Sequence, residues 1–279
     1  MEHDAKMPRD HALEPLAPGP LIRIACGELA VDIAPSAGGR IAQITRHGVP
    51  WLVGYSQENE AMIAWGSYPM VPWAGRVRHG QFRFQGSDYQ LPRNLGEHAI
   101  HGVGFGAPWQ IDEYSPTHLV LSLALPEDAH WPFGGTARQH IEVSENTLRL
   151  ALTLTAGKHA MPATIGWHPW FQKPDQLDFE PAAMYPRDRD GIATLPVSPP
   201  VAGPWDDCFI NQHPVFIHRN GQRLQLSSDC THWVVYDQPA HATCVEPQSG
   251  PPDAFNLTSN APILPGASVC AWFLFEWSP

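Results

Sequence analysis

The feature that most constrains the fold is a two-residue alternation of apolar and polar side chains, repeated in short segments along the chain. Residues 148–154 show it clearly, with leucine at every second position. Successive side chains of a β-strand point to opposite faces, so this period predicts strands with one buried face. No window of a dozen residues carries a helical stripe, and 30 prolines and 23 glycines punctuate the segments. The sequence therefore predicts an all-β protein, a large antiparallel β-sandwich with little helix.

The hairpin signal is strongest at Asn220-Gly221, because both residues tolerate the positive φ of a two-residue turn. The run 269–275 is apolar throughout, too short to span a membrane, and is expected to form a buried closing strand. The other predicted strands are residues 21–24, 28–33, 40–44, 81–84, 89–91, 119–125, 141–143, 148–154, 215–217, 224–226, 233–236 and 242–245.

The domain organisation follows from where this pattern begins and where it is interrupted. Residues 1–20 are polar, acidic and proline-bearing, with no apolar stretch of the kind a signal peptide needs, and are predicted to be a flexible arm that can be deleted. No linker divides residues 21–279, which are predicted to form a single domain. Residues 174–204 are proline-rich and contain the charge run 187–190, which predicts a surface excursion with solvated charges.

Charge and cysteine content exclude several classes of partner and site. Lysine and arginine number 17 against 28 acidic residues, for a formal charge of −11, so nucleic acid and anionic membranes are not expected partners. The five cysteines are scattered without a CxxC spacing, which predicts no disulfide framework and favours a reducing, cytoplasmic location. The sequence predicts no cofactor and carries no signal for an oligomeric state.

Glu246 is the first candidate for chemistry. It follows the predicted strand 242–245, and Pro247, Pro251 and Pro252 are expected to end that strand in a rigid loop. A carboxylate at such a position can be partly desolvated, which raises its pKa and makes it a usable general base. The alternative is a solvated loop glutamate.

Two of the 15 histidines stand out by context. His101 precedes two glycines, where backbone can approach a ligand closely, and His168 lies between two tryptophans. His98 and His101 are three residues apart and so point to opposite faces of a strand, which argues against a shared metal and predicts no metal site. The nearby tryptophans could pack against a sugar ring or belong to the core. A glutamate, two histidines and aromatic side chains together predict acid–base chemistry on a polyhydroxylated ring.

The chain resembles the aldose 1-epimerases, or galactose mutarotases, from about residue 21 to the C-terminus. This resemblance implies their galactose mutarotase-like supersandwich, a large antiparallel β-sandwich. The motifs that carry it are Gly38-Gly39-Arg40-Ile41, Gly75-Arg76-Val77, Gly80-Gln81-Phe82, Ala99-Ile100-His101-Gly102, Trp167-His168-Pro169-Trp170-Phe171, Asp206-Asp207-Cys208-Phe209 and Glu246-Pro247-Gln248.

The resemblance implies interconversion of the α and β anomers of a free aldohexose by ring opening and closure. It implies that Glu246 is the general base at the C1 hydroxyl and His168 the general acid at the ring oxygen. His101 matches a second histidine that polarises the same region. The residues that match sugar-binding positions are Arg76, Asp206 and Gln248.

Departures from the family pattern leave alternatives open. Many relatives have asparagine where this chain has Gly75. The cluster Arg76, Arg78, Arg83 and Arg93 could bind the phosphate of a hexose 6-phosphate, or form a solvated strand face. Two further alternatives are a sugar-binding module without turnover and a glycoside-processing enzyme that pairs Glu246 with Asp206 or Asp253.

Overall fold

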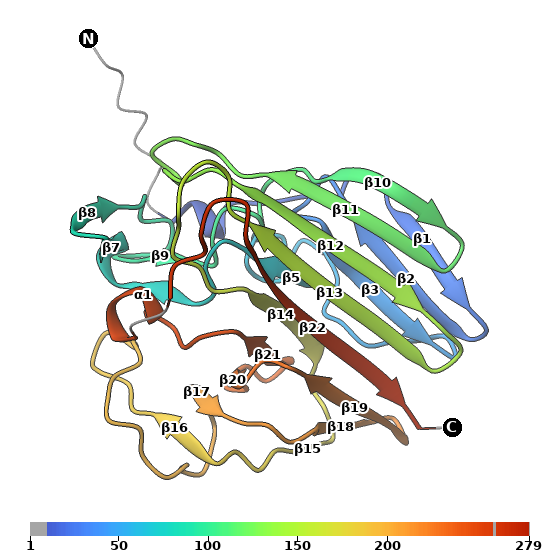
Figure 1. The fold of residues 1–279 in the computed structure, drawn as a ribbon. Coiled ribbons are helices and arrows are strands. Elements are labelled where there is room, and N and C mark those ends of the chain that lie inside the picture. The colour runs from blue at the N-terminus through green and yellow to red at the C-terminus, as the bar shows by residue number, and fades with distance from the viewer. Residues whose placement is uncertain (1–9, 259–260, 279) are drawn as a thin grey trace.

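Two large antiparallel sheets pack on one another in the computed structural model, which describes residues 10–258 and 261–278 (Figure 1). The first sheet has the strand order β1-β2-β3-β5-β14-β21-β20-β17-β16, and β4 pairs with β3. Its strands are β1 (Ile22–Cys26), β2 (Leu29–Ala34), β3 (Arg40–Arg46), β4 (Val49–Pro50), β5 (Ser67–Met70), β14 (Gly166–Gln172), β16 (Ala183–Tyr185), β17 (Asp206–Ile210), β20 (His232–Tyr236) and β21 (Ala242–Gln248).

The second sheet has the order β10-β11-β12-β13-β22-β19-β18-β15. Its strands are β10 (Gln110–Ser115), β11 (His118–Ala124), β12 (Thr136–Val143), β13 (Thr147–Thr155), β15 (Gln176–Asp178), β18 (Val215–Arg219), β19 (Gln222–Ser228) and β22 (Ser268–Trp277). The predicted closing strand is thus central in this sheet, where β22 pairs with β13 and β19.

Short elements cover one end of the sandwich. Two small hairpin-like pairs are β6 (Arg76–Val77) with β9 (Ala99–Ile100), and β7 (Gln81–Phe84) with β8 (Ser87–Gln90). The helical turns are η1 (His11–Leu13), η2 (Arg78–Gly80) and α1 (Ala254–Leu257). No helix among the described residues is long and apolar enough to cross a membrane.

The predicted all-β, antiparallel fold is confirmed, and the period-two pattern explains it. In β13 the side chains of residues 148, 150, 152 and 154 are buried, while their neighbours are exposed or half-buried. The inward-facing residues of both sheets form one continuous apolar core. At the predicted hairpin between β18 and β19, Asn220 and Gly221 have φ of 50° and 73°. We retain the single domain over residues 21–279 as a proposal that this shared core supports.

The described part of the predicted arm is not free, which corrects the prediction for residues 10–20. Ala12 is fully buried and exchanges backbone hydrogen bonds with Asn94 and Ile63. Leu16 and Met62 continue this pairing, with N–H groups that donate to Glu60 and Glu14. The apolar pattern in residues 10–20 is too short to predict a packed segment from the sequence. Backbone hydrogen bonds with residues 60–63 and with Asn94 attach this segment to the rest of the domain. Residues 1–9 of the arm lie outside the described residues.

Deletion of residues 1–16 is accordingly expected to lower stability rather than leave it unchanged. The deletion removes the backbone hydrogen bonds of Ala12, Glu14 and Leu16, each worth about 1 kcal/mol. For a chain of this size a loss of about 2–4 kcal/mol lowers Tm by roughly 5–15 °C. Thermal unfolding of the shortened chain measures this, and a variant lacking only residues 1–9, which keeps these contacts, is the control. An unchanged Tm in the longer deletion would show that the segment contributes nothing.

Candidate active site

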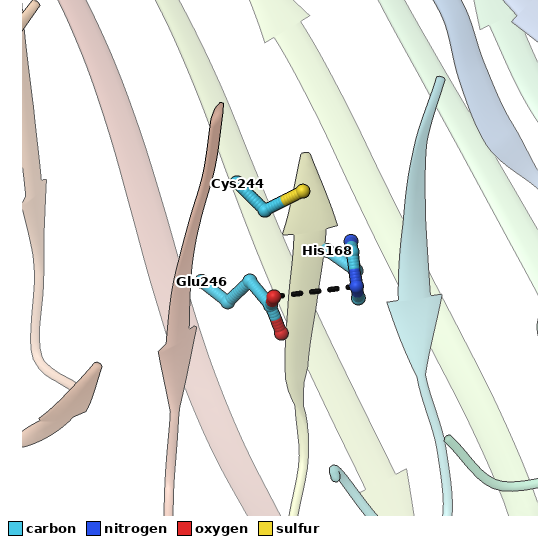
Figure 2. Close-up of side chains that lie close together, drawn as sticks. All are labelled: His168, Cys244 and Glu246. Atoms are coloured by element: carbon cyan, nitrogen blue, oxygen red, sulfur yellow. Dashed lines mark ion pairs between the residues drawn. The ribbon is translucent and has the colours of Figure 1, made fainter. Parts of the chain in front are cut away.

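An opening between β14 and β21 brings an imidazole and a carboxylate together at the centre of the first sheet. The pairs Gly166–Gln248 and Trp170–Cys244 flank this opening, and in the same register His168 lies opposite Glu246. The Nε2 atom of His168 is 3.2 Å from Oε1 of Glu246, and both side chains are almost fully buried (Figure 2).

The strand that carries Glu246 differs from the prediction. β21 does not end at residue 245 but continues through Pro247 to Gln248, and its residues 244–248 pair with β20. Proline lacks the N–H group that a strand ladder uses, and both Pro169 and Pro247 lie where β14 and β21 are unpaired. The glutamate is therefore a buried residue in mid-strand, not the first residue of a loop.

Alternation along the neighbouring strands directs further side chains to the same face. Residues two apart on a strand share a face, so Gln248 accompanies Glu246, and Asp206 on β17 and Tyr236 on β20 lie in an adjacent row. These side chains and His168 line a cavity of about 250 Å³. Gln248 is fully buried, and its Nε2 donates to Oε2 of Glu246 at 3.2 Å.

The rim of the cavity is formed by the pair β6–β9, which supplies Arg76 and His101. Gly75 has φ of +69°, and a Cβ there would lie 2.9 Å from Pro252, so the tight approach explains glycine at this position. Gly102 has φ of +77°, and a Cβ would collide with the carbonyl oxygen of Val71 at 1.9 Å. These backbone constraints fix the places of Arg76 and His101.

Several polar groups of the residues that line the cavity have no hydrogen-bond partner among the described residues. Among the buried atoms of the described residues, Nδ1 of His101, Nδ1 of His168 and Oε1 of Gln248 have no hydrogen-bond partner. The guanidinium of Arg76 is half-buried at the cavity and forms no side-chain hydrogen bond or ion pair with any described residue. Buried polar groups normally have partners, so this concentration of unpaired groups is typical of a binding site.

Burial controls the protonation of the central pair. It raises the pKa of Glu246 well above its ordinary value, and the nearby Asp206 adds to this, while Gln248 and Arg76 act in the opposite direction. Burial also lowers the pKa of His168 to about 3 and that of His101 well below its ordinary value. These shifts favour the protonated form of Glu246 and the neutral form of both histidines, so a proton shared by the pair is favoured on the carboxyl group over the imidazole.

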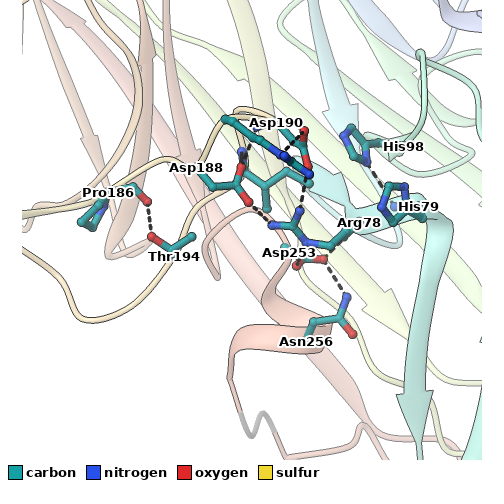
Figure 3. Close-up of polar contacts among 11 residues, drawn as sticks. Arg78, His79, His98, Pro186, Asp188, Asp190, Thr194, Asp253 and Asn256 are labelled. Atoms are coloured by element: carbon teal, nitrogen blue, oxygen red, sulfur yellow. Dashed lines mark hydrogen bonds and ion pairs between the residues drawn. The ribbon is translucent and has the colours of Figure 1, made fainter.

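The charge run 187–190, predicted to be a solvated face, is solvated only in part: Arg189 is exposed, whereas Arg187 lines the cavity. Arg187 forms an ion pair with Asp206 at 3.0 Å. The next residues are held by Arg78, whose guanidinium contacts Asp188 and Asp190 (Figure 3). The backbone N–H of Arg78 in turn donates to the buried Asp253 at 2.8 Å. The pairing partners lie far away in sequence, so the charge run alone could not reveal these contacts.

All six predicted site residues line the cavity: Arg76, His101, His168, Asp206, Glu246 and Gln248. Trp170, one of the two tryptophans beside His168, lines it as well, in agreement with the period of two along a strand. The sequence does not point to Leu13, Arg187 and Tyr236, which also line the cavity. The contributions of Leu13 and Arg187 depend on tertiary contacts and had no such signal.

Comparison with known proteins identifies the family. The sequence model of the family described as "Aldose 1-epimerase" matches residues 20–271. The chain belongs to the aldose 1-epimerase family.

Two proteins of Escherichia coli (strain K12), the uncharacterized proteins YihR and YphB, are similar in sequence to this aldose 1-epimerase family member. YihR is 29% identical over 159 residues, covering 54% of this chain and 50% of YihR. YphB is 31% identical over 148 residues, covering 52% of this chain and 49% of YphB. These alignments thus span about half the length of either relative.

Solved structures share the aldose 1-epimerase fold at low sequence identity. The GalM/aldose epimerase homologue from C. elegans superposes with a TM-score of 0.80 at 16% identity, covering 93% of this chain and 98% of that one. The galactose 1-epimerase from Lactobacillus acidophilus NCFM gives 0.77 at 19% identity, covering 92% and 94%. The expected galactose mutarotase-like sandwich is confirmed.

Proposed function

We propose that the protein is an aldose 1-epimerase that interconverts the α and β anomers of a free aldohexose. The observation that carries the proposal is the 3.2 Å contact between His168 and Glu246 in a small cavity lined by both apolar and polar side chains. Opening a hemiacetal requires that one proton leave the C1 hydroxyl and another reach the ring oxygen. An adjacent carboxylate and imidazole can perform both transfers.

The reaction begins with the single proton that the pair holds. The C1 hydroxyl of a bound sugar donates a hydrogen bond to Glu246, and its ring oxygen accepts one from His168. Binding of the sugar therefore favours the carboxylate form of Glu246 and the imidazolium form of His168. The proton reaches His168 across the contact with Glu246. Glu246 then takes the C1 hydroxyl proton, His168 protonates the ring oxygen, and the bond between C1 and that oxygen breaks to give an aldehyde. Rotation about the C1–C2 bond and the reverse transfers give the other anomer and restore the pair.

The surrounding residues hold the sugar in this proposal. Arg76, which has no side-chain hydrogen bond or ion pair within the part of the chain that the structure describes, offers its guanidinium to ring hydroxyls, and Asp206 offers a carboxylate that Arg187 orients. Gln248 orients Glu246 and has a free carbonyl oxygen, while His101 lies edge-on to His168 with ring centroids 4.9 Å apart. Truncating one of these groups is expected to raise KM more than truncating Glu246, because they bind the ground state as well.

The geometry favours this reaction over the two non-phosphate alternatives. In a two-carboxylate glycosidase, Asp253 would have to face the cavity, but its carboxylate accepts hydrogen bonds from Arg78 and Asn256 outside it. Asp206 faces the cavity but is paired with Arg187. A sugar-binding module without turnover has no need for a buried carboxylate in contact with an imidazole, since burying such a pair costs stability.

Optical rotation of freshly dissolved α-D-glucose and α-D-galactose tests the proposal. The protein is expected to accelerate the relaxation of at least one sugar without changing the end point. If both sugars relax at the buffer rate with folded protein present, the proposed activity on free aldohexoses is rejected.

An unphosphorylated sugar is expected to be preferred over its 6-phosphate by at least tenfold in kcat/KM, about 1.4 kcal/mol of transition-state binding. Of the four clustered arginines only Arg76 lines the cavity. The other three, Arg78, Arg83 and Arg93, form ion pairs with acidic residues. A phosphate would have to displace Asp206 from Arg187 to find a second guanidinium. Initial rates with glucose and glucose 6-phosphate measure the ratio, and a tenfold preference for the phosphate would reject the neutral-sugar proposal.

The proposed setting of the enzyme is the reducing cytoplasm. All five cysteines are free thiols, and three of them are buried, which suits a chain that forms no disulfides.

A further inference from the structure

A third metal-binding side chain lies beside the acid–base pair. Cys244 and Glu246 are two apart on β21 and share a face, and His168 lies opposite on β14 (Figure 2). One nitrogen, sulfur or oxygen atom from each of the three lies within 4.8 Å of the other two, and all three side chains are buried. The sequence predicts no metal site because these three side chains come from neighbouring strands, and spacing along the sequence cannot show that they lie together.

We propose that His168, Cys244 and Glu246 bind Zn²⁺ reversibly, and that the cavity holds either this ion or the sugar. The effect on rate rests on the proposed function, because zinc would occupy its acid and base, but the binding itself does not. Since His168 and Glu246 line the cavity in which the sugar would bind, an ion can reach them from it and would occupy the two groups that the reaction uses.

The donor set selects the ion. Thiolate, imidazole and carboxylate are the ligands that zinc uses, and three of them with one open position is a common arrangement. Mg²⁺ and Ca²⁺ require mostly oxygen ligands, so this site discriminates against them. The thiolate and carboxylate charges balance those of Zn²⁺. Binding would release the thiol proton of Cys244 and the proton of the His168–Glu246 pair to solvent.

The environment of the ligands favours release of the ion rather than permanent retention. Tight zinc sites hold the second nitrogen of a ligating histidine with a hydrogen-bond acceptor, whereas Nδ1 of His168 has no partner among the described residues. Gln248 orients Glu246, so only part of an outer shell exists. The positive charges of Arg40 and Arg76 act on His168 and oppose a further cation. Zinc in this site would thus be removed by a chelator, with recovery of the free acid–base pair.

Cys244 separates metal binding from catalysis. It does not line the cavity, and the proposed reaction does not use it. The Cys244→Ser variant is therefore expected to keep turnover within about twofold of the parent protein in the absence of metal and to lose zinc sensitivity. The matched control is Cys230→Ser, which removes another buried thiol at a distance from the site.

The experiment titrates chelator-treated protein with Zn²⁺ by calorimetry and measures mutarotation at each zinc concentration. The parent protein and Cys230→Ser are expected to bind one zinc in competition with the sugar, and Cys244→Ser to bind at least tenfold more weakly. Co²⁺ added to the parent protein is expected to give a thiolate-to-metal charge-transfer band, which tests Cys244 as a ligand even if the serine variant does not fold.

Equal zinc inhibition of the parent protein and folded Cys244→Ser, or a Co²⁺ complex without the charge-transfer band, overturns the proposal and assigns inhibition to other histidines. One-to-one zinc binding that depends on Cys244, in a protein that does not accelerate mutarotation, supports the site and rejects the proposed function. Mutarotation that no zinc concentration inhibits rejects the zinc site and leaves the proposed function intact.

Discussion

Glu246→Gln is expected to lower the turnover of anomer interconversion by about 10²- to 10⁴-fold, the range typical of a lost general base. Glutamine keeps the size of the side chain but cannot accept the C1 hydroxyl proton. Burial favours the uncharged form of this carboxyl group, and the amide is uncharged as well, so the fold is expected to persist. Initial rates by polarimetry give the loss.

Two measurements make the result on Glu246 interpretable. Thermal unfolding establishes that the variant is folded, and Glu142→Gln, at an exposed position of β12, controls for the substitution itself. A folded Glu246→Gln protein with turnover within about threefold of the parent would reject the role of Glu246 as the base.

Arg40→Met is expected to destabilise the fold by about 3–5 kcal/mol, because it removes the donor from several buried carbonyl oxygens. Arg40 is fully buried, and its guanidinium donates to carbonyl oxygens of four residues. These acceptors are Ala37, Met62, Trp65 and Phe105. Methionine would leave them without these donors, at about 1–3 kcal/mol for each acceptor that water cannot reach.

Urea unfolding measures the loss, and Arg23→Met is the matched control. Arg23 is largely exposed and pairs with Asp32 on the neighbouring strand, so its removal is expected to cost less than about 1 kcal/mol. Equal free energies of unfolding for the two variants would contradict the structural role of Arg40. The motif Gly38-Gly39-Arg40-Ile41 therefore supports the site through Tyr68. The guanidinium of Arg40 lies 5.0 Å from the Tyr68 ring, and this ring stacks on His168.

The fold could be predicted from sequence because its signal is local. Alternation along residues 148–154 identified β13, and Asn220-Gly221 identified the hairpin between β18 and β19. Glu246 and His168 were recognised as ionisable groups in otherwise apolar or aromatic segments, the environment that perturbs a pKa.

The misses are all contacts between distant segments. Cys244 belongs to the candidate zinc site only because His168 lies beside it on the adjacent strand β14. Arg187 belongs to the cavity wall, where it forms an ion pair with Asp206. Leu13 reaches the cavity because backbone pairing attaches its segment to the sandwich. β21 can continue through Pro247 because it is not paired with β14 at this position. The sequence of residues 242–248 alone does not indicate this opening.

In the proposed reaction, this cavity opens and closes a sugar ring by proton transfer to and from Glu246 and His168. Magnetisation exchange between the two anomeric proton resonances of an equilibrated aldohexose tests this reaction most directly, because the exchange reports interconversion of the anomers without any net reaction. Parent protein is expected to produce exchange between the α and β resonances, and Glu246→Gln to abolish it while still binding the sugar. Sugar binding by the parent protein with no exchange above the buffer rate would contradict the account and leave a binding module in its place.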